Sequence, residues 1–294
     1  MKSTSAARIK TAKTSHSDLI AGDKLYLERA RITLPYLVRQ AKSGKTIYYS
    51  DLAILVDIPN PRNLNYVLGA IGNALIDLSK RTKVDIPPIQ CLVVNKRDEL
   101  PGDSIEWFIS STEFSKLNKT QKQNVVAVQL TKINTFQFWD WVLEQLNLEP
   151  IKTDLSSVIK TAKSRKGGGE SIQHKKFKEF ISRNPKAIGL NPDLIQGQIE
   201  YQFPSADTVD VLFKENDLTI GIEVKSIISD TADVFRGIFQ CVKYKYLIEA
   251  EQIVCDKIPN SRVILALQGK FPNELLLVKN ILGVEVIDNI AIVE

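Results

Sequence analysis

The chain has few of the residues that build disulfide frameworks and thiolate metal sites. Its 294 residues include three cysteines, two histidines and one methionine. Three cysteines cannot all pair, and Cys91, Cys241 and Cys255 lack the close spacing of zinc ligands. This scarcity argues against a disulfide-stapled domain and against a zinc finger. It leaves carboxylates as the ligands for any metal chemistry.

Long hydrophobic runs are also missing. Runs such as residues 125–128 and 275–278 are short, whereas a membrane helix needs about 20 apolar residues. Residues 1–18 are basic and polar, which is not the pattern of a secretory signal. Hydrophobic residues make up 44% and charged residues 25%, as in ordinary globular proteins. We therefore expect a cytoplasmic protein with no membrane partner.

Positive charge is concentrated in two segments of a chain whose formal net charge is +5. One is the segment 1–22. The other is the segment 152–178, which contains eight Lys or Arg residues and two acidic residues. Clustered cations release counterions from a phosphate backbone, which favours nucleic-acid binding. A solvated linker and tail would look the same. The residues predicted to contact nucleic acid here are Lys163, Arg165, Lys166 and Lys175.

Three consecutive glycines at residues 167–169 mark the predicted domain boundary. They follow a polar, lysine-rich stretch, and glycine runs form flexible joints because they have almost no backbone preference. We predict four parts, which are a basic tail at 1–22, an N-terminal domain at 23–150, a linker at 151–169 and a C-terminal domain at 170–294.

Hydrophobic periodicity predicts a mixed α/β protein. In the N-terminal domain it predicts helices over residues 23–43, 51–56, 63–80 and 134–148 and a buried strand over 91–95. Pro35 suggests a kink or a break in the first helix. In the C-terminal domain it predicts helices over 170–184, 231–251 and 272–282, with strands over 199–203, 208–214, 218–227, 263–268, 284–287 and 291–293.

Charged residues interrupt two of the predicted strands. Glu223 and Lys225 are two residues apart, so they share one face of their strand, and Asp210 lies within a hairpin's reach. Charges in apolar strands need partners, which suggests that the three groups converge. Two carboxylates suit Mg²⁺, with Mn²⁺ as a substitute. The lysine could orient or help deprotonate a water and offset charge on a phosphate. The alternative is a salt bridge on an ordinary α/β domain.

The sequence from Asp210 to Glu223-Val224-Lys225 resembles the PD-(D/E)XK signature of restriction-endonuclease-like nucleases, with Val209 in place of the proline. The resemblance covers residues 170–294. It implies an αβββαβ core and Mg²⁺-dependent cleavage of DNA. The metal would lie on Asp210 and Glu223, and Lys225 would lie beside the nucleophile.

Two neighbouring features strengthen this resemblance. The family opens with a helix whose acidic residue joins the metal site, and we assign this role to Glu170, seven residues before the inward-facing Phe177. One branch of the family carries a Q-x-x-x-Y motif after the catalytic strand, and Gln240 and Tyr244 match it. One helical turn separates them, so both could touch a phosphate or brace the lysine.

Three more polar residues lie near the predicted site. His174 is four residues after Glu170 and could contact the substrate or the carboxylate, or be satisfied by a neighbour in its helix. Asp207 and Glu200 are spare ligand candidates, and a solvated face is their alternative.

The N-terminal half contains G-x-x-x-x-Y-x-x-L-A at residues 44–53. It resembles the winged-helix DNA-binding domain of O6-alkylguanine DNA alkyltransferases and alkyltransferase-like proteins. The resemblance implies that the helix at 63–80 docks on DNA, with Arg62, Asn63 and Asn65 near it. Cys91 falls near the alkyl-acceptor position but lacks the His and Arg that activate a thiolate, so alkyl transfer is not expected. A protein-contact module is the alternative.

These patterns together predict a two-domain, metal-dependent DNA endonuclease. A role in restriction or anti-phage defence follows by analogy only. Two alternatives stay open, which are a DNA-binding or regulatory protein that does not cut and a structure-specific repair or recombination nuclease. A homodimer that cuts both strands is a further expectation.

Overall fold

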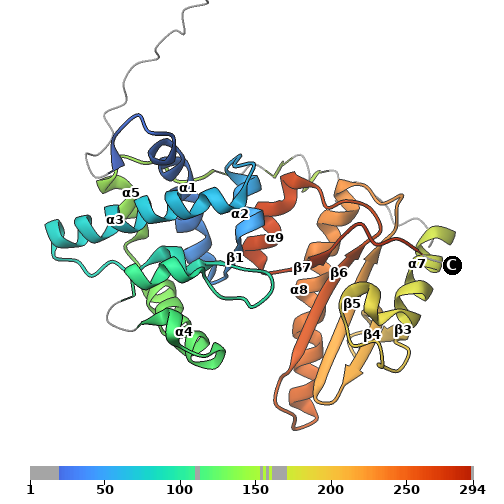
Figure 1. Cartoon of the computed structure of the whole chain (residues 1–294). Coiled ribbons are helices and arrows are strands. Elements are labelled where there is room, and N and C mark those ends of the chain that lie inside the picture. The colour runs from blue at the N-terminus through green and yellow to red at the C-terminus, as the bar shows by residue number, and fades with distance from the viewer. Residues whose placement is uncertain (1–19, 110–112, 153–154, 157–158, 161–170, 293–294) are drawn as a thin grey trace, which may run out of the picture. The chain divides into compact units, whose positions relative to one another are not determined.

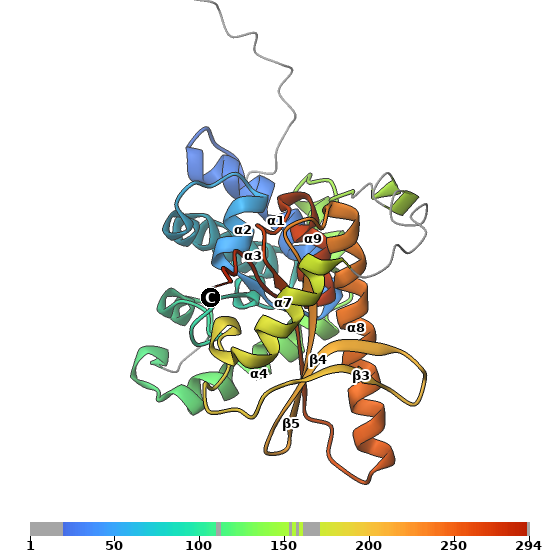
Figure 2. The ribbon, with the colours of Figure 1, turned by 90° about the vertical axis from the view of Figure 1, so that its right-hand side faces the viewer.

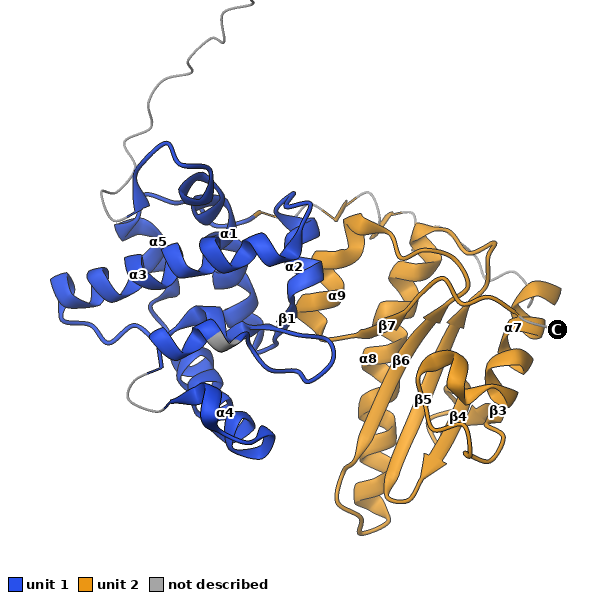
Figure 3. Cartoon of the chain, viewed as in Figure 1, with its two compact units in different colours: residues 1–151 blue, residues 152–294 orange. Residues whose placement is uncertain are grey.

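The computed structural model describes residues 20–109, 113–152, 155–156, 159–160 and 171–292. The chain divides into two compact units, residues 1–151 and 152–294, which Figure 3 shows in different colours. The protein is a mixed α/β protein with a five-stranded sheet. Among the described residues, none of the helices combines the length and the hydrophobicity that a membrane span requires.

Unit 1 is mainly helical (Figure 1), and its buried hydrophobic residues form a core cluster. Helices α1 and α3 pack against each other, and two short strands pair in parallel. Its elements are α1 (Leu25–Ser43), β1 (Ile47–Tyr48), α2 (Tyr49–Leu55), η2 (Pro61–Asn63), α3 (Leu64–Thr82), η3 (Ile89–Leu92), β2 (Val93–Val94), η4 (Asp103–Trp107), η5 (Phe114–Lys116), α4 (Lys119–Thr135) and α5 (Trp139–Gln145).

The strongest helix predictions in unit 1 are confirmed. The apolar residues of α3 recur at three- and four-residue spacing and are buried, including Leu64, Ile71 and Leu75. The predicted first helix is α1, and it continues through Pro35, which is buried inside it. No break occurs at this proline.

Other predictions in unit 1 were wrong. The predicted strand over 91–95 is confirmed only at Val93–Val94, which form β2, because Cys91 and Leu92 belong to η3. The predicted helix over 134–148 is the end of α4 followed by α5. Most of α4 was missed because it buries only Val126 and Ile133, so it shows little of the three- and four-residue apolar spacing that predicts a helix. The available signal was the capping box, in which the side chains of Asn118 and Gln121 each accept from the other's backbone N–H.

Unit 2 contains a sheet with the strand order β3-β4-β5-β6-β7 (Figure 1), and Figure 2 shows the same ribbon turned by 90°. The pairs β3–β4 and β4–β5 are antiparallel, whereas β5–β6 and β6–β7 are parallel. Its elements are α7 (Ile172–Arg183), η6 (Pro185–Ile188), β3 (Gln198–Gln202), β4 (Thr208–Glu215), β5 (Leu218–Lys225), α8 (Thr231–Val254), β6 (Ser261–Leu267), η7 (Asn273–Leu275), α9 (Leu276–Leu282) and β7 (Glu285–Ile287).

The order α7-β3-β4-β5-α8-β6 is the αβββαβ order expected from the sequence. The parallel pairing of β5 and β6 requires a crossover, which α8 supplies. Several details differ from the prediction, since β5 ends at Lys225 rather than at residue 227 and the predicted helix over 272–282 is η7 followed by α9. The described part of the first helix begins at Ile172, and residues 291–292 are not a strand.

Alternate residues of β5 face different helices. Ile222 and Val224 share a buried cluster with Phe177 of α7. On the other face, α8 approaches the sheet closely at Gly237, where an added Cβ would lie 2.9 Å from Lys225 Cε. The two-residue period of the strand therefore places Glu223 and Lys225 on the side covered by α8.

Candidate active site

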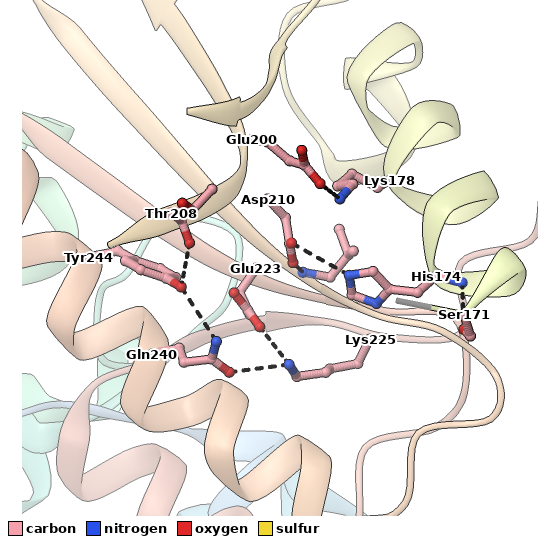
Figure 4. Close-up of polar contacts among 11 residues, drawn as sticks. Ser171, His174, Lys178, Glu200, Thr208, Asp210, Glu223, Lys225, Gln240 and Tyr244 are labelled. Carbon is pink, nitrogen blue, oxygen red and sulfur yellow. Dashed lines mark hydrogen bonds and ion pairs between the residues drawn. The ribbon is translucent and has the colours of Figure 1, made fainter. Parts of the chain in front are cut away.

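Asp210 stands at the start of β4, beside the end of β5. The β4–β5 register pairs Val211 with Ile222, and Asp210 lies one residue beyond this pair. Its Oδ2 accepts a hydrogen bond of 2.9 Å from the Val224 N–H. The carboxylate thus continues the contact between the two strands and is held beside the charged end of β5 (Figure 4).

Glu223 and Lys225 lie on one face of β5, as the sequence predicted, and they form a buried ion pair. Lys225 Nζ donates to Glu223 Oε1 at 2.5 Å, and the two side chains are 13% and 3% exposed, respectively. Burial, together with the negative charge of Asp210, raises the pKa of Glu223 to about 7. Burial alone would lower the pKa of Lys225, but the neighbouring Glu223 outweighs it and the pKa is raised. The lysine is therefore a cation near neutral pH.

A chain of hydrogen bonds connects this lysine to α8 and back to β4 (Figure 4). Lys225 Nζ donates to Gln240 Oε1 at 3.2 Å, and Gln240 Nε2 donates to Tyr244 Oη at 3.4 Å. The Tyr244 hydroxyl then donates to the Thr208 carbonyl oxygen at 2.7 Å. The two residues of the Q-x-x-x-Y motif thus hold the lysine and the start of the strand that carries Asp210.

His174 reaches the site from α7. The Ser171 side chain caps this helix by accepting from the His174 N–H, which places the histidine in the first turn. Its Nε2 lies 3.4 Å from Asp210 Oδ1. Burial would raise the pKa of Asp210, but the hydrogen bonds from His174 and Val224 and the charge of Lys225 lower it. His174 therefore contacts a carboxylate, that of Asp210, whereas the neighbouring Glu170 lies outside the described residues.

The two spare ligand candidates are held by lysines. Glu200 Oε1 accepts from Lys178 Nζ at 2.7 Å, and this hydrogen bond lowers the pKa of Glu200. The charge of Asp210 also acts on Glu200, so this pair lies beside the site. Asp207 accepts from Lys243 of α8 at 2.6 Å. Asp207 is therefore paired with α8.

Lys178 was not singled out from the sequence. Its side chain is only 4% exposed, although it belongs to the basic segment 152–178, for which phosphate contact or solvation is expected. A signal was available, because Lys178 is four residues after His174 and one after the buried Phe177, so it lies on the same inward side of α7. A cation at that position points to a partner inside the fold.

Several predicted site residues lie outside the described part of the chain. They are Glu170, Lys163, Arg165 and Lys166. Lys175 is described and is exposed on α7. Among the described residues, no group of three or more His, Cys, Asp and Glu side chains is arranged as a metal site. The metal site proposed below therefore rests on two described carboxylates.

The residues predicted to bind DNA in unit 1 lie where α3 begins. Arg62 and Asn63 belong to η2, Asn65 is in the first turn of α3, and all three are exposed. Cys91 is fully buried in η3, and burial raises the pKa of its thiol far above the usual value. A buried thiol of this kind is inert, which agrees with the expectation that the chain does not transfer alkyl groups.

No protein-family model matches the chain, and comparisons with curated proteins and with solved structures found no significant match. Function is therefore inferred from the chemistry of the site. Two carboxylates, a buried ammonium and an imidazole converge beside the junction of β4 and β5. Such a set can hold a divalent cation and bind a phosphate ester.

Proposed function

We propose that unit 2 is a metal-dependent nuclease that hydrolyses the phosphodiester bonds of DNA. One observation carries this proposal, which is the buried convergence of Asp210, Glu223 and Lys225. A salt bridge that only stabilised the fold would need one acid. The second acid works against folding, because its charge raises the pKa of Glu223.

The described donors fit a divalent cation. Carboxylate oxygens are the ligands that Mg²⁺ and Mn²⁺ prefer, and Mg²⁺ commonly binds one or two carboxylates and keeps its other waters. Asp210 and Glu223 would hold it, and the mutual repulsion of their charges favours a cation between them. When bound, the ion would supply Lewis acidity to a water and to the phosphate.

The remaining residues support hydrolysis through position and charge. Because its pKa is raised, Lys225 is protonated and fits the stabilisation of a negatively charged phosphate better than the role of a base. Gln240 and Tyr244 fix the direction of the ammonium through their hydrogen bonds. His174 orients Asp210. In the reaction, water attacks phosphorus and the bond to one ester oxygen breaks.

The choice of DNA rests on unit 1. The start of α3 exposes Arg62, Asn63 and Asn65, side chains that suit phosphates and base edges. A winged-helix role for this unit is part of the proposal. Restriction or defence, the homodimer and the cytoplasmic location stay predictions.

Cleavage of supercoiled plasmid DNA in MgCl₂ tests the proposal, with EDTA and Lys225→Ala in parallel. The matched control is Lys214→Ala, because Lys214 is an exposed lysine on the neighbouring strand β4. We expect nicked and linear products from the wild type and from Lys214→Ala. We expect none in EDTA and none from Lys225→Ala.

Each departure from this pattern has a meaning. Cleavage that persists in Lys225→Ala would refute the assigned site. Metal-independent DNA binding without cleavage of plasmid, branched or single-stranded DNA would favour the non-cutting alternative. Cleavage confined to branched DNA would favour the repair or recombination nuclease.

A further inference from the structure

The turn after β5 exposes two large apolar side chains. Strand β5 ends at Lys225 and helix α8 begins at Thr231, and residues 226–229 turn the chain between them. Ile227 is 59% exposed and Ile228 is 58% exposed. The hydrolysis proposed above does not involve them, although they come two and three residues after the buried ammonium.

Isoleucine is an unfavourable choice at these two positions. The Ser229 N–H donates to the Ser226 carbonyl oxygen at 3.0 Å, which makes Ile227 and Ile228 the central residues of a hydrogen-bonded turn. Central turn positions are usually filled by Gly, Pro, Asn, Asp or Ser, whereas isoleucine favours strands. The exposure of both apolar side chains to water is a further cost. The pair therefore indicates a partner that the described fold does not supply.

Hydrogen bonds from the neighbouring strand hold this turn in place. Gln268 directly follows β6, and its backbone N–H donates to the Lys225 carbonyl oxygen at 3.0 Å. Its side-chain Oε1 accepts from the Ile227 N–H, also at 3.0 Å. A Cβ added at Gly269 would lie 3.6 Å from Ile227 Cδ1, so this side chain leans on the segment after β6. The anchoring fixes the two isoleucines beside the end of β5.

The position of the turn defines the partner. The Cα atom of Ile227 lies within about 7 Å of that of Lys225, which is about two base steps along a DNA strand. A phosphodiester at the acidic site would therefore bring its sugars and bases to the turn, and these are the apolar part of DNA. Lys270, which follows Gly269, is exposed and suits a neighbouring phosphate. An apolar pair beside a cation thus matches a nucleotide step.

We propose that Ile227 and Ile228 form a wedge that presses between bases at the cleaved step of DNA and opens their stack. Apolar side chains, isoleucine among them, unstack base steps in this way. The inference rests on the proposed function, because it places DNA at the acidic site. Unstacking costs least where a base is mismatched or unpaired. The wedge therefore gives the enzyme a preference for DNA that carries such a step beside the cleaved bond.

DNA binding by the full-length Lys225→Ala protein, measured by fluorescence anisotropy in MgCl₂, tests the wedge without cleavage. The two probes are a duplex with one central mismatch and the fully paired duplex of the same length. The wedge variant adds Ile227→Ser and Ile228→Ser to this protein. The matched control adds Ile258→Ser instead, because Ile258 is 88% exposed and lies near the opposite end of β5, where the Asn260 carbonyl oxygen accepts from the Thr219 N–H.

We expect the Lys225→Ala protein and the control to bind the mismatched duplex about fivefold more tightly than the paired one, because unstacking costs less there. The wedge variant should bind both duplexes equally and melt at no lower temperature, since serine suits a turn. Equal binding of both duplexes by the Lys225→Ala protein would overturn the proposal, as would a preference that the wedge variant keeps. A change in the oligomeric state of the wedge variant, seen by sedimentation, would identify a protein contact and also overturn it.

Cleavage of the same two duplexes by the chain with Lys225 intact separates this proposal from the nuclease proposal. We expect the mismatched duplex to be cleaved faster, beside the mismatch, and Ile227→Ser with Ile228→Ser to remove the difference. Equal cleavage of both duplexes by the wild type would overturn the wedge and leave the nuclease standing. A mismatch preference in binding that needs the isoleucines, without cleavage of either duplex, would refute the nuclease and leave the wedge as a DNA contact.

Discussion

The buried pair of Glu223 and Lys225 predicts an unusual response to metal when the lysine is removed. In Lys225→Met, a carboxylate that is 3% exposed loses its ammonium partner while Asp210 stays nearby. Removing one partner of a buried ion pair costs about 3–5 kcal/mol. A divalent cation at the two carboxylates would replace the lost positive charge. We therefore expect Mg²⁺ to stabilise the variant more than it stabilises the wild type.

The sign of the pH dependence follows from Glu223. Its pKa in the folded protein is about 7, above the ordinary value of 4.5. The folded state therefore binds more protons than the unfolded state between these two pH values. The stabilisation that protonated Glu223 gives to the folded state is lost as the pH rises through 7. The cost of Lys225→Met is then largest at alkaline pH, and protonation of Glu223 relieves part of it in mild acid.

The assay is urea unfolding of the wild type, Lys225→Met and the exposed-lysine control Lys214→Met, each in EDTA and in saturating MgCl₂. At about pH 8 in EDTA, we expect the free energy of unfolding of Lys225→Met to be about 3–5 kcal/mol below that of the wild type. In MgCl₂ we expect much of this difference to disappear. The free energy of unfolding of the control should stay within about 0.5 kcal/mol of the wild-type value. An equal loss with and without Mg²⁺ would refute the reasoning and leave the pair as a structural salt bridge.

Three further predictions concern single groups. The affinity for Mn²⁺, measured by calorimetry, should rise about tenfold from pH 6 to pH 8 as Glu223 loses its proton; a flat profile would contradict this pKa. Gln240→Met should lower kcat about tenfold with little change in KM, because the Lys225 ammonium loses its hydrogen bond to Gln240. The control Tyr246→Phe, at an exposed position on the same helix, should have no effect. Equal kinetics of the two variants would remove Gln240 from the site. Iodoacetamide should modify Cys255 in the folded protein and Cys91 only after unfolding, as mass spectrometry would show; rapid labelling of Cys91 would mean that its thiol is accessible.

Much of unit 2 could be predicted because its signals are local. The two-residue period of β5 places Glu223 and Lys225 on one face whatever surrounds the strand. The one-turn spacing on α8 likewise puts Gln240 and Tyr244 together. Both juxtapositions are present in the structure, with hydrogen bonds between the paired side chains. Helix α4 shows the limit of this reasoning, because it buries only Val126 and Ile133 and therefore lacks the apolar periodicity on which the helix predictions depend.

Which charged residues share a strand or a helix face follows from backbone periodicity, which acts over a few residues and can be read from the sequence. The partners of those residues depend on how distant elements pack. This packing brought His174 from α7 to Asp210 on β4 and buried Lys178 against Glu200. The pKa of about 7 at Glu223 also belongs to this level. Burial and the coupling of charges arise where elements distant in the chain pack together, and no local pattern encodes them.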